Sequence, residues 1–251
     1  NHLLDSERRF MKNLHLIISV VFSILSPTSA NSSEKCEANL PDGSHYIGEC
    51  KDGLFHGQGR LKWSTGTVYE GDFYEGLKHG KGKTMHSSGW VYEGDFRGGV
   101  EKGTGRFVFS NGDTYIGEFK DEEFNGFGTF NSITGSVYEG EFKNSLFHGK
   151  GQMTLPNGGK VVAEYKNGVL NGKGKSYIAN GNVYTGEYRD GEWNGHGVYA
   201  YSNGDMYIGE FKNGFFHGNG EFVDAKSGEV TKGTWINGEY QDSSNECQAQ
   251  S

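Results

Sequence analysis

The chain has 251 residues, including 42 glycines, 14 tyrosines and 17 phenylalanines but only 3 prolines. So many aromatic residues exclude a disordered glycine-rich chain, because their large apolar surface favours a folded core. The formal net charge of −8 disfavours a nucleic-acid-binding protein, which needs a basic face, and weakens any purely electrostatic attraction to anionic lipid.

The first element along the chain is an apolar run, Leu14–Leu25, which follows Lys12 and precedes small residues up to Ala30. A basic start, about 12 apolar residues and a small-residue end predict a cleaved secretory signal over residues 11–30. An uncleaved anchor is the alternative, although spanning a bilayer takes about 20 residues. We therefore expect export to the periplasm, the extracellular space or a lumen, with membrane association as a further option. We expect residues 1–10 to be an upstream artefact.

A strict 23-residue period organises the rest of the chain. Glycine recurs at fixed places in each repeat, as Gly48, Gly57, Gly59 and Gly66 do in the first. We place the repeat array at residues 44–240, after an N-terminal lead-in at residues 31–43 and before a polar tail at residues 241–251. The residues that open successive repeats are Tyr46, Tyr69, Tyr92, Tyr115, Tyr138, Val161, Tyr184 and Tyr207.

Each repeat contains two stretches of alternating residues. Tyr69, Gly71 and Phe73 share one face of a strand, because side chains alternate between faces with a period of two. Phe107 and Phe109 give the same pattern in the second half of a repeat. The sequence therefore predicts an all-β fold, an elongated twisted antiparallel meander of about eight 23-residue β-hairpin repeats.

The Asn-Gly turns decide the register of these hairpins. A two-residue loop would put the two aromatic sets on opposite faces. A three-residue loop at residues 110–112 places Tyr115 opposite Phe107 and Gly117 opposite Gly105, so that all the rings share one face. This register also pairs opposite charges across the strands: Arg60–Glu70, Lys83–Glu93, Lys81–Asp95, Lys150–Glu164 and Lys173–Glu187. We therefore predict the three-residue loop.

The other connection in each repeat is predicted to be a longer loop with an apolar middle. These apolar residues are expected to fold back over the aromatic face. They are Leu54–Phe55, Leu146–Phe147, Val169–Leu170 and Phe215–Phe216.

Two segments resemble the end of a phosphate-binding P-loop, namely Gly82-Lys83-Thr84 and Gly174-Lys175-Ser176. Both occupy the same slot of the repeat, where the other repeats carry unrelated residues in place of the lysine. A P-loop must follow a strand and open a helix, and no helical apolar period is present. We therefore expect no nucleotide at these segments.

The polar positions repeat as well. A histidine precedes a glycine at His56, His79, His148 and His217, and asparagine fills this slot elsewhere, which favours a turn role. Repeats about 10 Å apart cannot share a metal ion through these histidines. An acidic residue also recurs in every repeat, and together these residues form an acidic row: Glu49, Asp72, Asp95, Glu118, Glu141, Glu164, Glu187 and Glu210. We interpret the acidic row as a solvated, partly ion-paired face, with calcium binding as the open alternative. We assign no catalytic, cofactor-binding or metal-binding residue and expect no cofactor and no enzymatic activity.

The pattern Tyr-x-Gly-x-Phe, then Gly-x-Gly, then Asn-Gly at a 23-residue period resembles the MORN (membrane occupation and recognition nexus) repeat. The resemblance covers about residues 43–240. It implies β-hairpin arrays, and it implies membrane association, phospholipid binding, scaffolding or dimerisation. The chain departs from the pattern at Cys50, at Val161 and Ala163, and at Glu122 and Ser145.

From these observations we expect a non-enzymatic, exported binding or scaffolding protein. Its partner would be another protein or a membrane phospholipid surface, not nucleic acid, and a homodimer is compatible with the pattern. The alternatives are a phospholipid-binding recruitment module and an accessory subunit of an enzyme such as a lipid kinase or hydrolase. The candidate binding face consists of Tyr46, Tyr69, Phe73, Tyr92, Phe96, Tyr115, Phe119, Tyr138, Phe142, Tyr184, Tyr188, Tyr207 and Phe211. The opposing expectation is that apolar loop residues cover these rings.

Three cysteines remain, Cys36, Cys50 and Cys247. In an oxidising compartment we predict a Cys36–Cys50 disulfide that caps the first repeat, because Cys247 follows the last repeat of an extended array. The alternative is three free thiols.

Overall fold

The structure is a computed structural model, and it describes residues 33–241. The predicted signal at residues 11–30, the upstream residues 1–10 and Cys247 lie outside the described residues. The chain divides at Phe130 into two compact units, each of which is described by itself.

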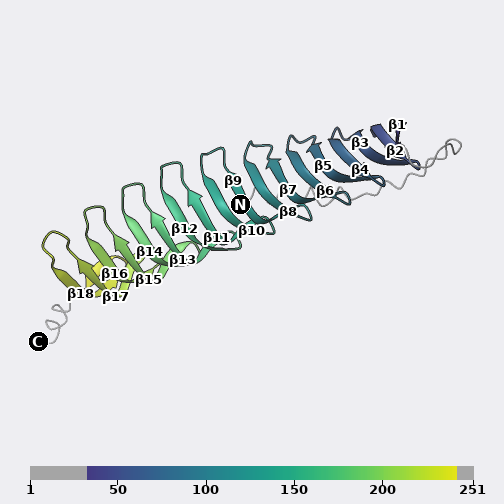
Figure 1. Ribbon diagram of the computed structural model, residues 1–251. Coiled ribbons are helices and arrows are strands. Elements are labelled where there is room, and N and C mark those ends of the chain that lie inside the picture. Colours follow the sequence, from purple (N-terminus) through teal and green to yellow (C-terminus); the bar gives the residue numbers. More distant parts are fainter. Residues whose placement is uncertain (1–32, 242–251) are drawn as a thin grey trace, which may run out of the picture. The chain divides into compact units, whose positions relative to one another are not determined.

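Unit 1 is an antiparallel meander in which each strand pairs with the strands before and after it in the chain (Figure 1). Its first strand, β1, lies inside the predicted lead-in. The strands among its described residues are β1 (Glu34–Asn39), β2 (His45–Lys51), β3 (Leu54–Lys62), β4 (Val68–Tyr74), β5 (Leu77–Met85), β6 (Val91–Arg97), β7 (Val100–Val108), β8 (Thr114–Lys120) and β9 (Glu123–Asn131).

Unit 2 is built in the same way, and the prediction of an all-β hairpin meander is confirmed in both units. Its described strands are β10 (Val137–Lys143), β11 (Leu146–Thr154), β12 (Lys160–Lys166), β13 (Val169–Tyr177), β14 (Val183–Arg189), β15 (Glu192–Ala200), β16 (Met206–Lys212), β17 (Phe215–Val223), β18 (Val230–Ile236) and β19 (Glu239–Gln241).

The turn between β7 and β8 confirms the predicted three-residue loop. Phe107 lies opposite Tyr115, and Gly105 lies opposite Gly117. The Gly112 amide donates to the Phe109 carbonyl at 2.9 Å, and Gly112 takes the left-handed conformation with φ 94°. Glycine adopts this conformation without a steric penalty, so the Asn-Gly pair sets the register of the hairpin.

The predicted longer loop is wrong. Lys51 lies directly opposite Leu54, which leaves a two-residue turn made of Asp52 and Gly53. Both turn residues are left-handed, with φ 52° and 75°, as a type I′ hairpin turn requires. Asp-Gly supplies that conformation, so the apolar residues that follow are free to begin the next strand.

Although these apolar residues lie in strands, the second residue of each pair covers the aromatic face as expected, whereas first residues such as Leu54 and Phe215 are exposed. Phe55 stacks on Tyr46 with ring centroids 3.8 Å apart and planes 12° apart. The Tyr115–Phe124 and Tyr207–Phe216 pairs also stack at 3.8 Å. The core of most hairpins is therefore a pair of flat rings above the backbone, with further rings packed edge-on against them.

The sixth repeat departs from this plan in two compensating ways. Val161 replaces the tyrosine whose ring would cover the paired glycines, and Ala163 replaces one glycine of the pair. Ala163 is buried, and its methyl group lies above Gly174, in the space that the ring fills elsewhere. The missing ring therefore leaves room that a methyl group partly fills.

The structure joins Cys36 and Cys50 by a disulfide, with 5.9 Å between their Cα atoms. Cys36 lies in β1 and Cys50 in β2, which is paired with β1. Cys50 occupies the slot that other repeats fill with an aromatic residue, and it is buried. The bond therefore ties the first strand of unit 1 to the first repeat.

Candidate functional site

The aromatic face that the sequence suggests for binding lies in the core. Its thirteen residues expose only 0% to 5% of their surface, so a partner cannot reach them: Tyr46, Tyr69, Phe73, Tyr92, Phe96, Tyr115, Phe119, Tyr138, Phe142, Tyr184, Tyr188, Tyr207 and Phe211. This placement corrects the expectation of an aromatic binding face. The physical reason is the strand residue that stacks on the tyrosine in most repeats, such as Phe55 on Tyr46.

The tyrosine hydroxyls complete their hydrogen bonding inside the core. The Tyr46 hydroxyl donates to the Glu49 carbonyl at 2.7 Å, and Tyr115 donates to the Glu118 carbonyl at 2.9 Å. Burial, together with the charge of Glu49, raises the pKa of Tyr46 to about 12, so the hydroxyl remains a neutral donor. These groups anchor the repeat and offer no reactive site.

The opposite face of each sheet carries a groove with a floor of glycine backbone. Residues one and three places after each tyrosine point outward, and the glycine between them faces the core, so that only its backbone borders the outer face. In unit 2 the floor runs through cross-strand pairs, Gly174 to Gly186, Gly186 to Gly197 and Gly197 to Gly209. The two outward rows form the walls of this groove, which has a volume of about 760 Å³.

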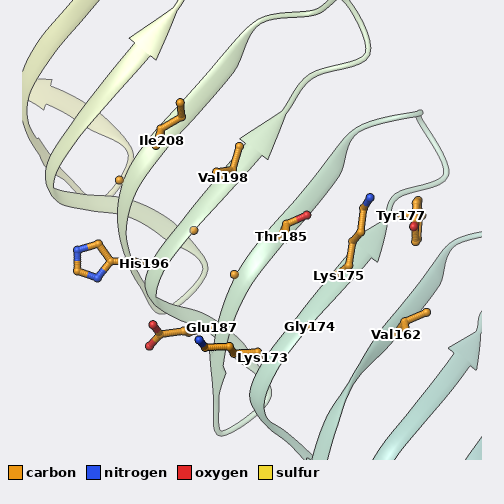
Figure 2. A pocket seen from close by; sticks show the side chains of 13 residues that line it. Val162, Lys173, Gly174, Lys175, Tyr177, Thr185, Glu187, His196, Val198 and Ile208 are labelled. Atoms are coloured by element: carbon orange, nitrogen blue, oxygen red, sulfur yellow. The ribbon is translucent and has the colours of Figure 1, made fainter.

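One wall of the unit 2 groove is largely apolar, as Figure 2 shows. Each of its members lies directly opposite the next across β12 to β16: Val162, Lys175, Thr185, Val198 and Ile208. Val162 and Ile208 are 42% and 41% exposed. Within this wall, the ammonium group of Lys175 lies 4.8 Å from the ring centre of Tyr177. The aliphatic part of the Lys175 side chain adds to the apolar surface of the wall.

The other wall of the unit 2 groove is polar. Figure 2 shows Lys173, Glu187 and His196 along it, across the glycine floor from the apolar wall. Lys173 lies opposite Glu187, and His196 lies opposite Glu210. The groove therefore presents apolar contacts on one side and charged or hydrogen-bonding groups on the other.

The equivalent groove of unit 1 has a charged wall in place of the apolar one. Arg60 pairs with Glu70 at 2.8 Å, and Lys83 pairs with Glu93 at 3.6 Å. The predicted opposition of these charges across the strands is confirmed by the register. The lining of this groove is therefore more polar than the lining of the unit 2 groove.

The acidic row has a structural role that the sequence analysis missed. The Asp72 carboxylate accepts the Lys81 amide at 2.9 Å, and Glu118 accepts the Phe127 amide at 2.9 Å. Each bond spans a bulge that contains a left-handed glycine, such as Gly80 with φ 56°. Any other residue at this position would place its Cβ against the carboxylate. The sequence feature that indicates this structural role is the fixed spacing between the Tyr-x-Gly-acid motif and the Gly-x-Gly motif.

The predicted turn role of the histidines is wrong. His56, His79, His148 and His217 lie within strands, and the left-handed residue in each case is the glycine that follows. The glycine takes the left-handed conformation that the extra residue of the bulge requires, so the histidine before it keeps extended geometry. Each of these histidines lies opposite an acidic residue, as His56 lies opposite Glu49.

The repeat pattern was compared with models of known protein families. The model described as MORN repeat matches eight consecutive segments, residues 46–68, 69–91, 92–114, 115–137, 138–160, 162–183, 184–206 and 207–229. The chain belongs to the MORN repeat family. The resemblance noted in the sequence is thereby confirmed, and the MORN repeats point to a non-catalytic repeat protein.

Two solved structures similar to this MORN protein come from Danio rerio CPAP. A point mutant of its TCP10 domain is 13% identical, with 80% of this chain and 99% of that chain covered and a TM-score of 0.41. The wild-type domain, in complex with a peptide of Danio rerio STIL, is 15% identical, with 80% and 100% covered and a TM-score of 0.38. A search among curated proteins found no match.

The P-loop-like segments of this MORN protein lie inside strands β5 and β13. Thr84 and Ser176 are buried in the core, whereas a P-loop would present these hydroxyls to a magnesium ion. Lys83 is paired with Glu93, and Lys175 lies in the apolar wall. Both segments are therefore ordinary repeat positions in a sheet.

Within residues 33–241, no three histidine, cysteine or acidic side chains lie close enough to hold a metal ion. The same part of the chain contains no helix able to cross a membrane. The two grooves follow the repeat register, because the residues that line them recur in the same slots of successive repeats.

Proposed function

We propose that this protein is a non-catalytic binding protein whose unit 2 groove holds an extended segment of a partner protein. The observation that supports it is the apolar wall of that groove, which replaces the charged wall of unit 1. An exposed row of valine and isoleucine beside bare backbone favours contact with another chain.

The geometry of the groove fits an extended segment. Side chains of such a segment alternate in direction, so apolar ones can meet Val198 and Ile208 while polar ones meet Lys173 and His196. Four floor glycines on neighbouring strands span about 14 Å, since strands lie about 4.8 Å apart. This length holds about four extended residues, and flanking residues would follow the walls further.

A random-peptide display library, selected on the full chain, tests this proposal with a matched pair of variants. Ile208 and Ile116 occupy the same slot of the repeat and are 41% and 52% exposed. We expect the selected peptides to bind Ile208→Glu at least about tenfold more weakly than wild type, because the carboxylate would be buried against apolar groups. Binding to Ile116→Glu should stay within about twofold of wild type. Equal losses for both variants, or no enriched peptides, would contradict the proposal.

A phospholipid surface is a second candidate, which a basic row in unit 2 favours. Lys143, Lys166, Arg189 and Lys212 are exposed residues that each precede a two-residue turn. Lys166 lies opposite exposed Val169, and Lys212 lies opposite exposed Phe215. Basic and apolar groups side by side can contact anionic headgroups and the upper acyl region.

Co-sedimentation with phosphatidylcholine vesicles, with or without phosphatidylserine, tests the second candidate. If lipid is the partner, wild type sediments only with the anionic vesicles, and Lys166→Glu/Lys212→Glu reduces the bound fraction several-fold, because each basic residue contributes about 1 kcal/mol. Ile208→Glu should leave vesicle binding unchanged and serves as the control. Failure of wild type to sediment rejects the lipid candidate and leaves the peptide proposal intact.

A further inference from the structure

Two neighbouring repeats of unit 1 break the aromatic stacking. The residue that stacks on the tyrosine is aromatic in most repeats, as Phe55 and Phe124 are. The second and third repeats carry Lys78 and Glu101 in this slot instead. Charged residues are seldom placed in a core unless they are paired, so this substitution needs a partner group.

The two side chains are buried together. The Lys78 ammonium lies 3.7 Å from a carboxylate oxygen of Glu101, and their side chains are only 12% and 7% exposed. Lys78 also lies over the ring of Phe96, 4.7 Å from its centre. One ion pair beside aromatic groups thus takes the place of the stacked rings of two repeats.

A third charged residue, Glu122, approaches this pair from the turn between β8 and β9. Its amide donates to the Glu101 carbonyl at 3.1 Å, which docks the turn on β7. Glu122 is left-handed, with φ 68°. The same turn position is glycine in most of the described repeats: Gly53, Gly76, Gly99, Gly168, Gly191, Gly214 and Gly238. A glutamate is disfavoured there unless its side chain gains an interaction.

The electrostatics of the cluster favour a bound proton. Burial, and then the nearby charge of Glu101, raise the pKa of Glu122 to about 7, and Lys78 opposes this rise only in part. A protonated Glu122 can donate a hydrogen bond to the Glu101 carboxylate. With both acids ionised, one lysine would face two carboxylates.

The remaining ionisable groups around the cluster do not supply the missing positive charge. Asp121, beside Glu122 in the turn, raises the pKa of Glu122 further, and the nearby Lys102 is paired with Asp121 at 3.6 Å. Tyr69 on β4 and Tyr92 on β6 remain neutral, because burial raises the pKa of both. Among these groups, Lys78 is therefore the cation that faces the two carboxylates, while Lys102 is paired with Asp121.

We propose that Lys78, Glu101 and Glu122 form a proton-binding site that fastens the β8–β9 turn to β7 when occupied and loosens it when empty. The direction of the pH effect follows from the pKa of Glu122, which is raised in the folded state above its usual 4.5. The folded chain then binds more protons than the unfolded chain between about pH 4.5 and 7. The stabilisation is fully present below pH 4.5 and is lost as the pH rises through 7.

Glu122→Gln tests this site, because glutamine keeps the shape and a donor group but cannot ionise. Chemical unfolding of the full chain gives the folding equilibrium constant of wild type divided by that of Glu122→Gln. With a pKa of 4.5 in the unfolded chain and about 7 in the folded chain, this ratio should fall roughly 70-fold between pH 5 and pH 8. As the control, Glu75→Gln removes an exposed turn carboxylate of the same unit. The folding equilibrium constant of wild type, divided by that of Glu75→Gln, should stay constant over this pH range.

Carbon-13 NMR of the wild-type carboxyl groups gives an independent readout. We expect Glu122 to titrate with a midpoint near 7, and Glu101→Gln to move that midpoint down by at least one pH unit. If Glu101→Gln fails to fold, the wild-type midpoint decides alone. A Glu122 midpoint near 4.5, or a stability ratio to Glu122→Gln that changes less than twofold with pH, overturns the proposal.

Discussion

Replacing Tyr115 with alanine is expected to lower the free energy of unfolding of unit 1 by about 3–5 kcal/mol, as large-to-small aromatic changes in cores do. The Tyr115 ring is fully buried and stacks on Phe124 at 3.8 Å. It also covers Gly117 and Gly128, and its hydroxyl donates to the Glu118 carbonyl. The variant loses the ring packing and this hydrogen bond together.

Hydrogen exchange followed by mass spectrometry checks this expectation. Exchange should accelerate most in β8 and β9, since neighbouring repeats contact mainly one another. Tyr74→Ala is a suitable control, because Tyr74 is 49% exposed and its loss should change stability by less than about 1 kcal/mol. Similar exchange in both variants would show that the buried ring contributes little to the repeat.

Adding a single methyl group at Gly186 is expected to be nearly as damaging. A Cβ at this position would lie 2.4 Å from the Tyr184 hydroxyl and 2.7 Å from the Cα of Gly197. Backbone on the facing strand cannot move away cheaply, so we expect Gly186→Ala to cost about 3 kcal/mol or more. The sheet would have to separate or the ring would have to leave the core.

The sixth repeat shows how this cost can be offset, since Val161 and Ala163 occur together there. Tyr184→Val/Gly186→Ala copies that pair into the next repeat. The double variant should be more stable than the sum of the two single changes predicts, by about 1–3 kcal/mol, because the methyl group enters the space that the ring leaves. Unfolding in denaturant measures all three variants. Strict additivity would show that the ring and the glycine are not coupled.

The sequence allowed the fold and the strand register to be predicted, because several independent patterns agree. The 23-residue period, the Asn-Gly turns and the opposed charges such as Arg60 and Glu70 all require the same hairpin. The two-residue turn was missed because the apolar pair Leu54–Phe55 suggested a loop that folds back. In fact Asp52 and Gly53 complete the turn alone.

The candidate site was harder to predict. Rings such as Tyr46 were candidates for a binding surface because one sheet face alone leaves them uncovered. The alternative, that Phe55 covers them, was expected from a loop, whereas Phe55 stacks on Tyr46 from the next strand. The groove could not be predicted, because its walls are known only after the register places Val198 and Ile208 in one row. The cluster of Lys78, Glu101 and Glu122 joins three repeats, so no single repeat reveals it.

The pairing of each strand with its immediate neighbours in the chain also bears on how the protein folds. In the β2–β3 hairpin the most distant partners are His45 and Lys62, and the closest are Lys51 and Leu54. Closing such short loops costs little entropy, whereas most all-β folds must first bring distant segments together. We therefore expect a low relative contact order and fast folding for an all-β chain. Within each unit, nucleation can begin at any adjacent pair of hairpins and spread to both sides.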